Sequence, residues 1–245
     1  MIDSSLSNPL YIAVSGGIDS MVLLHYLLYG RSEYSQSETI SPRVKELPFD
    51  SLVVLNYPYP DTHSQECLSF LKHFLSLPHP LPLSFLYPDT HSQVEVGEVS
   101  GIGLEDQWRR ERYRFFDKVV PEGGTLALAH HWDDNKVSFI INTLKGSERG
   151  FIPPVSLRNE GKYKVIRPLH LCPKQDIRKY QEVYQVPYLE DPTNRNSQRG
   201  KIEHILPLLE ANIHQMPGAL RNKYLHYLKQ YKPLWTIDLN PYEPT

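Results

Sequence analysis

The sequence is poor in cysteine, with two among 245 residues. Cys67 and Cys172 lie far apart along the chain and form no CxxC pair, so we expect neither a zinc knuckle nor a dithiol redox centre. No apolar run approaches the roughly 20 residues that a membrane-spanning helix needs. The N-terminus has neither a basic flank nor a long apolar core, which argues against a signal peptide. These absences predict a cytoplasmic protein with no membrane partner.

The net charge is also small, at −2. The basic residues are nevertheless concentrated, because the segment 155–201 carries ten Lys or Arg against five Asp or Glu. A basic region on a mildly acidic body is able to hold a polyanion such as nucleic acid. A solvated surface would have the same composition, so charge alone leaves both interpretations open.

Short apolar runs alternate with helical patterns through most of the chain, which is typical of βαβ units. We therefore predict an α/β fold with an open, mostly parallel five-stranded sheet and helices on both faces. The predicted strands are 10–14, 52–55, 83–86, 126–129 and 163–166. The predicted helices are 21–28, 67–75, 104–120, 133–144, 174–184 and 200–209.

We expect one domain over residues 1–209 and a helical tail with a loose end over 210–245. The stretch 30–48 is rich in Ser and Glu and is predicted to be a flexible loop. The heptapeptide of Tyr59–Gln65 recurs at Tyr87–Gln93, each time after a predicted strand. Its Pro-Asp-Thr core suits a turn and a helix N-cap, so a structural origin is favoured. The period is not sustained, which excludes a solenoid.

The segment Ser15–Ser20 reads Ser-Gly-Gly-Ile-Asp-Ser and lies between the first predicted strand and its helix. Two glycines let the backbone approach an anion closely, and the helix directs its free N–H groups at the loop. Ser15 and Ser20 are able to donate hydrogen bonds to phosphate oxygens, whereas Asp19 would hold Mg²⁺ between itself and the phosphates. No GK[ST] follows, so this is not a Walker P-loop. A plain strand-turn-helix is the alternative.

This hexapeptide is identified as the PP motif of the N-type ATP pyrophosphatases. Members of that superfamily split ATP between the α and β phosphates and adenylate a substrate. The resemblance implies ATP as cofactor and identifies the superfamily, not the substrate. The residues that it assigns to ATP binding are Ser15, Gly16, Gly17, Ile18, Asp19 and Ser20.

Later segments resemble the tRNA(Ile)-lysidine synthetases, a family within that superfamily. Leu104–Phe116 is similar to their A-R-x-x-R-Y-x-F-F helix, and Ala129–Asp134 is similar to their A-H-H-x-D-D motif. Further elements of the family follow in order at Leu144–Ser147, Arg167–Leu169, Glu190–Asn194, and Arg199 with Leu206–Leu209. The resemblance runs from about Leu10 to Leu209, and the chain looks like a short form without the usual C-terminal domain.

The family uses ATP to adenylate C2 of the wobble cytidine in tRNA(Ile) and then joins lysine to that carbon. The resemblance therefore implies ATP, Mg²⁺, free L-lysine and a tRNA(Ile) with a CAU anticodon, and it leaves a homodimer open. It implies catalytic roles for Asp19, His130, Arg109 and Arg112. It implies metal ligands among Asp19, Asp133 and Asp134, and tRNA contacts at Arg167, Asn194 and Arg199.

Plainer interpretations exist for most of these residues. Asp133 and Asp134 would each serve as helix caps, and Arg109 and Arg112 would lie on a solvated helix face. Asn194 and Arg199 would be a further cap and a surface charge. A zinc site at the adjacent histidines is disfavoured, because neighbouring side chains on a strand point to opposite faces.

Two other functions are considered. A tRNA thiolation enzyme of the same superfamily would need catalytic or cluster-binding cysteines, and the two cysteines here offer no suitable pair. A catalytically inactive RNA-binding relative would keep the fold but would release no pyrophosphate.

Overall fold

The computed structural model describes residues 9–33, 49–88, 104–147, 151–190 and 198–215, with 217, 218, 221, 222, 225 and 226. The strands are β1 (Pro9–Ala13), β2 (Ser51–Leu55), β3 (Leu83–Leu86), β4 (Thr125–Ala127), β5 (Val155–Arg158) and β6 (Tyr163–Ile166). The helices are α1 (Ile18–Glu33), α2 (Thr62–Leu75), α3 (Leu104–Val119), α4 (Trp132–Leu144), α5 (Lys174–Tyr184), α6 (Gln198–Ala211) and the 3₁₀ turn η4 (Ile213–Gln215).

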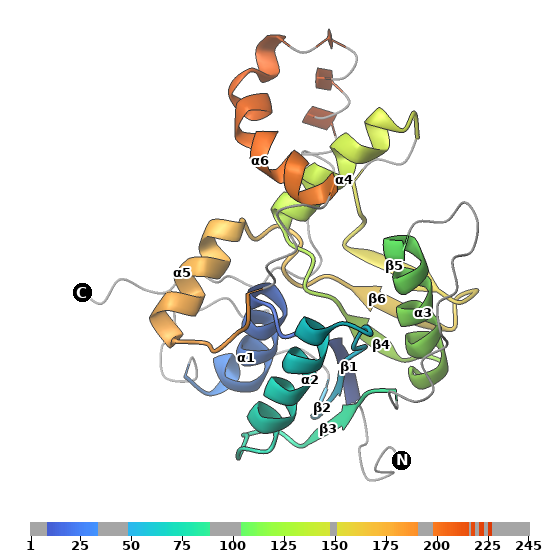
Figure 1. Ribbon diagram of the computed structural model, residues 1–245, viewed down its shortest axis with the longest axis vertical. Coiled ribbons are helices and arrows are strands. Elements are labelled where there is room, and N and C mark those ends of the chain that lie inside the picture. The colour runs from blue at the N-terminus through green and yellow to red at the C-terminus, as the bar shows by residue number, and fades with distance from the viewer. Residues whose placement is uncertain are drawn as a thin grey trace.

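These strands form one sheet in the order β3-β2-β1-β4-β6-β5. Every neighbouring pair is parallel except β5 and β6, which are antiparallel at one edge. The predicted α/β architecture with a mostly parallel open sheet is confirmed. In Figure 1, α1 and α5 lie side by side, α3 lies on another flank, and α4 and α6 stand together beyond the sheet.

Two apolar clusters show that helices cover both faces of the sheet. Alternate residues of β1 and β2, such as Ile12 and Val54, pack with α1, α2 and α5 on one face. The intervening residues, such as Tyr11 and Val53, pack with α3 on the other face. Because successive side chains of a strand point to opposite faces, both strands are almost entirely apolar, as buried parallel strands require, with Ser51 at the start of β2 as the polar exception.

The sheet contains six strands, so the predicted number of five is wrong. The missed strand is β5, whose side chains are exposed or half-buried, so it lacks the strongly apolar run of the inner strands. Asn159 and Glu160, both with positive φ (50° and 54°), form the tight turn that returns the chain into β6. The turn spans residues 159–162 and also includes Gly161, with a φ of 92°. Gly and Asn are the residues that adopt positive φ most readily.

Two local predictions are corrected or confirmed in part. Helix α1 continues to Glu33, into the stretch expected to be a loop, while residues 34–48 lie outside the described part. In the first copy of the heptapeptide, Asp61 caps α2 by accepting a hydrogen bond from the Ser64 amide at 2.8 Å. Most of the second copy and most of the tail lie outside the described residues. In the described part, no helix combines the length and apolarity needed to cross a membrane.

Candidate functional site

The carboxyl ends of β1 and β4 meet in the middle of the sheet. β1 pairs with β2 on one side and with β4 on the other, so the connections after β1 and β4 run in opposite directions (Figure 1). Such a switch point opens a crevice outside the carboxyl ends of the strands, where open α/β sheets bind ligands. The segments that follow these two strands are the predicted phosphate loop and the histidine-aspartate motif.

The loop after β1 has the backbone geometry that its glycines predict. Gly16 has a φ of +95°, which residues with a Cβ rarely adopt, and a Cβ there would lie 3.2 Å from Cβ and Sγ of Cys67. Helix α1 begins two residues later, at Ile18. An α-helix leaves its first N–H groups without partners inside the helix and carries a partial positive charge at that end. The loop therefore presents an anion-binding helix terminus to the crevice.

The two serines of the loop have different roles. The Ser20 hydroxyl donates to the Gly17 carbonyl at 2.9 Å and accepts from the Ser15 amide at 3.2 Å, so it closes the loop on itself. The Ser20 hydroxyl also lies 3.2 Å from that of Ser15, and both serines line the pocket. The prediction that both donate to phosphate stays a prediction. Ser15 is exposed, and its oxygen accepts from the Gly17 amide at 3.3 Å.

Asp19, on the first turn of α1, is the centre of a polar cluster. Its Oδ1 accepts from the Lys174 ammonium at 2.5 Å and lies 3.7 Å from Nε2 of the buried His131. Lys174 is the first residue of α5, so the ion pair joins segments 155 positions apart in the chain. The segment before Glu190 also contacts the loop, since the Leu189 amide donates to the Gly16 carbonyl at 3.0 Å.

The carboxylates of Asp133 and Asp134 have structural partners at the start of α4. Asp134 and His131 form a reciprocal capping box, in which the His131 amide donates to Asp134 at 2.9 Å. Asp133 accepts from the Lys174 amide at 2.7 Å and so ties α4 to α5. The helix-cap interpretation therefore holds for Asp134. No group of three or more metal-binding side chains occurs among the described residues, so neither the shared metal cluster nor a zinc site is seen there.

A pocket of about 600 Å³ lies at the switch point, within the range of small-molecule sites. The predicted residues Ser15, Gly17, Ile18, Asp19, Ser20, His130 and Arg112 line it, together with Lys174, Arg178 and Glu190. Asp133, Asp134 and Arg109 do not line it. The structure thus brings the loop, two histidines (His63 and His130) and three cationic side chains together around one cavity.

Adjacent histidines of the A-H-H motif diverge, but both lie beyond β4, which ends at Ala127, so the strand geometry expected for them does not apply. His130 lines the pocket, whereas His131 turns away to cap α4 and is 5% exposed. Arg109 and Arg112 diverge less: both flank the ring of Tyr113, but Arg109 is exposed and Arg112 reaches the pocket.

The remaining predicted tRNA contacts have different outcomes. Arg167 is 8% exposed and donates to the Pro153 carbonyl at 2.7 Å and to the Ser156 hydroxyl at 3.2 Å. This position makes it an anchor for β5 and not an exposed contact. Its burial lowers the pKa of the guanidinium. Asn194 lies outside the described residues, and Arg199 lies in α6 without a described side chain.

Three pocket residues were not singled out from the sequence. Lys174 and Arg178 lie one turn apart on α5, and a lysine and an arginine among many give no distinct signal in sequence. Asn56 follows β2, is 4% exposed, and donates from Nδ2 to the Val14 carbonyl at 2.7 Å. Its Oδ1 is buried and has no hydrogen-bond partner within the described part of the chain. A polar residue at the end of an apolar strand was the available signal.

His170, in the turn after Arg167, gives the fold a predicted pH dependence. It is fully buried, its Nδ1 accepts from Asn135 at 2.9 Å, and burial, with a smaller effect of Arg167, lowers its pKa to about 4. The unfolded chain binds this proton near pH 6.5. The contribution of His170 to the free energy of unfolding is therefore fully present above about pH 6.5. This contribution is lost as pH decreases toward 4, and the loss is on the order of 2–3 kcal/mol.

Urea unfolding at several values between pH 7.5 and 5 measures this slope. His170→Gln keeps an acceptor for Asn135 without titrating, so we expect it to flatten the curve. Burial also lowers the pKa of His25, which is present in both proteins and cancels in the comparison. A difference between the two proteins that stays constant with pH would show that His170 does not carry the effect.

A glycine-bearing loop between the first strand and its helix, beside a basic pocket at the switch point, defines a nucleotide-binding α/β domain. A family model described as a PP-loop domain matches residues 1–209. The chain therefore belongs to the PP-loop domain family, as its PP motif predicted.

The curated relatives are similar to this chain over most of its length. A tRNA(Ile)-lysidine synthase of Xanthomonas axonopodis pv. citri (strain 306) is 27% identical over 229 residues, which cover 90% of this chain and 46% of that protein. The synthase of Staphylococcus aureus (strain COL) is 28% identical, covering 92% and 48%. The chain thus spans about half the length of these relatives.

Among solved structures, the U34-tRNA thiolase NcsA from Methanococcus maripaludis, determined with its [4Fe-4S] cluster, has a TM-score of 0.57 and 17% identity. The match covers 93% of this chain and 74% of that one. At this identity the likeness supports the fold alone.

Proposed function

We propose that this protein uses ATP to adenylate C2 of the wobble cytidine of tRNA(Ile) and then joins lysine to that carbon. The observation that carries the proposal is the single pocket that gathers the PP loop, Asp19, His130 and Arg112. These residues come from three motifs that are far apart in sequence and resemble one family in order. The similarity to two tRNA(Ile)-lysidine synthases supports the same reaction.

The pocket residues fit the triphosphate of ATP. The loop and the start of α1 supply amide donors, and Lys174, Arg178 and Arg112 supply three positive charges around the same cavity. The buried Oδ1 of Asn56 accepts hydrogen bonds only, which suits the amino group of a purine or pyrimidine base. When bound, ATP supplies the AMP group that activates the C2 oxygen as a leaving group.

The residues also fit Mg²⁺, with a narrower ligand set than the sequence suggested. Mg²⁺ is commonly held by one or two carboxylates with substrate phosphates and waters. Asp19 is the carboxylate at the loop, whereas Asp133 and Asp134 are engaged by α4 and α5. We therefore assign Asp19 as the side chain of this protein that binds Mg²⁺.

The chemistry leaves defined tasks to this chain. As the C2 oxygen bonds to the α phosphorus, pyrophosphate leaves, and Arg112 and Lys174 stabilise the charge that develops. The lysine amine then bonds to C2 and displaces AMP, giving up a proton that His130 is placed to receive. Glu190 also lines the pocket, and its carboxylate suits the ammonium group of the incoming lysine.

The decisive experiment incubates the full chain with unmodified tRNA(Ile) transcript, ATP, Mg²⁺ and labelled lysine. We expect label in the RNA, with one AMP and one pyrophosphate released per lysine. A transcript with uridine at the wobble position is the matched control and should take up none. ATP cleavage without label would point to another acceptor, and RNA binding without cleavage would point to an inactive relative.

A second candidate, tRNA thiolation, is kept because one thiol lines the pocket. Sγ of Cys67 lies 3.5 Å from Nε2 of His63, and both side chains face the cavity. Cys172 is buried and does not line it.

If the ligase proposal holds, Cys67→Ala and Cys172→Ala should each retain lysine transfer within about threefold, since small buried substitutions mainly affect stability. The measurement is initial rate of lysine incorporation, and dependence on either thiol would favour thiolation.

A further inference from the structure

An arginine cluster surrounds the ring of Tyr113 at the border of the pocket. The guanidinium of Arg158 lies 4.2 Å from the ring centroid, that of Arg109 lies 5.7 Å away, and that of Arg112 lies 5.9 Å away. The charge of Arg109 contributes to lowering the pKa of Arg167, so the guanidinium of Arg167 also lies near this cluster. These side chains come from α3, from β5 and from the end of β6. Strand β5, which was not predicted from the sequence, adds Arg158 to the two arginines of α3.

The positive charge of this cluster is only partly balanced. The carboxylate of Asp117 lies 3.9 Å from Arg158 and also accepts from the Tyr163 hydroxyl at 2.7 Å. Elsewhere on α3, Glu111 is paired with Arg114, and Asp106 lies three positions before Arg109. Like charges held this close repel one another, so the arrangement favours a bound anion.

Two guanidinium donors in the cluster have no partner. Nε of Arg158 and Nε of Arg167 are buried and make no hydrogen bond to any residue that the structure describes. A buried donor without a partner is costly, so the charge of the guanidinium is poorly satisfied inside the fold. The Arg158 side chain is 40% exposed, so a phosphate oxygen would reach its terminal nitrogens and not Nε. The guanidinium plane also matches phosphate geometry and stacks on an aromatic ring, which is how Arg158 lies on Tyr113.

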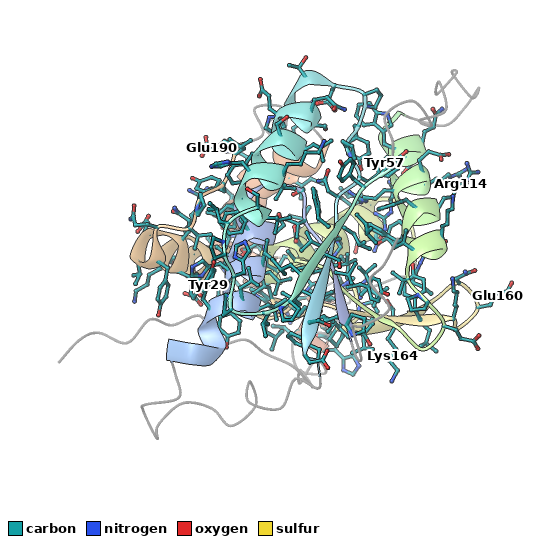
Figure 2. All side chains as sticks on the ribbon, turned by 90° about the horizontal axis from the view of Figure 1, so that it is seen from below. Tyr29, Tyr57, Arg114, Glu160, Lys164 and Glu190 are labelled. Carbon is teal, nitrogen blue, oxygen red and sulfur yellow. The ribbon has the colours of Figure 1, made fainter. Side chains whose placement is uncertain are left out.

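We propose that Arg109 and Arg158, next to the pocket residue Arg112, form a binding site for phosphate groups of the RNA backbone beside the nucleotide that enters the pocket. This rests on the proposed function, since it requires a nucleotide to reach the pocket. Arg112 and Tyr113 line the pocket, whereas Arg109 and Arg158 do not, so the cluster extends outward from it. RNA that delivers one base into the pocket would place its flanking phosphates there. Figure 2 shows Arg114 and Glu160 projecting from this same flank, α3 and the β5–β6 turn.

The test measures binding of unmodified tRNA(Ile) by fluorescence anisotropy over a range of salt concentrations. Arg158→Gln should weaken binding about tenfold and lower the slope of log K against log salt by about one, as expected for one lost phosphate contact. Lys164→Gln removes an exposed charge from the adjacent strand, outside the cluster, and should change neither quantity appreciably. Equal losses of RNA affinity in Arg158→Gln and Lys164→Gln would mean that the overall positive charge, and not a specific site, attracts the RNA. That result would overturn the proposed site.

ATP offers the same phosphate chemistry, so a second arm measures ATP binding to the same proteins. Unchanged ATP affinity with weakened RNA binding supports the RNA backbone as the ligand. Weakened ATP affinity with unchanged RNA binding overturns it. Because Arg158 packs in the fold, Arg109→Gln provides an exposed member of the cluster and should reproduce the RNA effect.

Binding needs no catalysis, so these results are separable from the proposed function. Lysine incorporation could fail while the salt slopes still differ between Arg158→Gln and Lys164→Gln, which would leave the phosphate site standing. Conversely, normal lysine incorporation with identical slopes would remove this site and leave the proposed function intact.

Discussion

Asp19→Asn is expected to reduce ATP-dependent AMP release about 10²–10³-fold, the usual cost of removing one preorganised charge from a phosphoryl-transfer site. The substitution keeps the size of the side chain and an oxygen that accepts from Lys174. It removes the negative charge that Asp19 would share with Mg²⁺ and the phosphates. The effect should therefore appear in chemistry and not in folding.

The measurement is the rate of AMP release as Mg²⁺ is titrated at saturating ATP. The variant should need a higher Mg²⁺ concentration for half-maximal rate, while its melting temperature changes little. Asp133→Asn is the matched comparison, because Asp133 follows the adjacent strand but binds the Lys174 amide and does not line the pocket. If Asp133→Asn raised the Mg²⁺ requirement as much, the cation site would extend to α4, as the sequence first suggested.

The contrast between these two aspartates shows how far sequence reasoning reaches. The PP loop could be predicted because its determinants are local: a strand, two glycines and a helix start within a few residues. The role of Asp133 could not, because its partner is an amide at the start of α5, 41 positions away. Asp134 differs, because its partner in the capping box, His131, lies only three positions away, and a helix-cap role was one of the two interpretations open from the sequence.

Long-range placement also explains the outcome for arginine. Arg109 and Arg112 were predicted on one helix face, and both do flank Tyr113. Whether each reaches the pocket depends on how α3 packs on the sheet, which spacing alone does not determine. Arg167 follows an inner strand and is covered by β5, an edge strand with too little apolar character to predict. Because β5 was not predicted, Arg167 was expected to be a surface contact, whereas it is a buried anchor for that strand.

Lys174→Gln is expected to weaken ATP binding about 10–100-fold, the range for one lost charge-assisted hydrogen bond or two. The ammonium of Lys174 is the group that offsets Asp19 in the pocket, at 2.5 Å. Without it, an unbalanced carboxylate would face the anionic nucleotide. Lys174→Arg should recover part of the affinity, because it restores the charge with a different shape.

Equilibrium ATP binding with Mg²⁺ varied distinguishes the roles open to Lys174. Lys179→Gln, on an exposed position of the same helix, is the control and should bind ATP normally. A purely structural lysine would lower the melting temperature and leave ATP affinity unchanged, which would contradict the prediction.

The Mg²⁺ dependence carries a further distinction. The Lys174 ammonium contacts Oδ1 of Asp19, and Mg²⁺ would bind the same oxygen. The two cations therefore compete for it. Removing the ammonium should therefore lower the Mg²⁺ concentration needed for half-maximal binding, even as maximal affinity falls. Asp19→Asn shifts that concentration upward, so the two variants should move it in opposite directions. Shifts in the same direction would mean that Lys174 acts only on the phosphates and that its contact with Asp19 plays no part in cation binding.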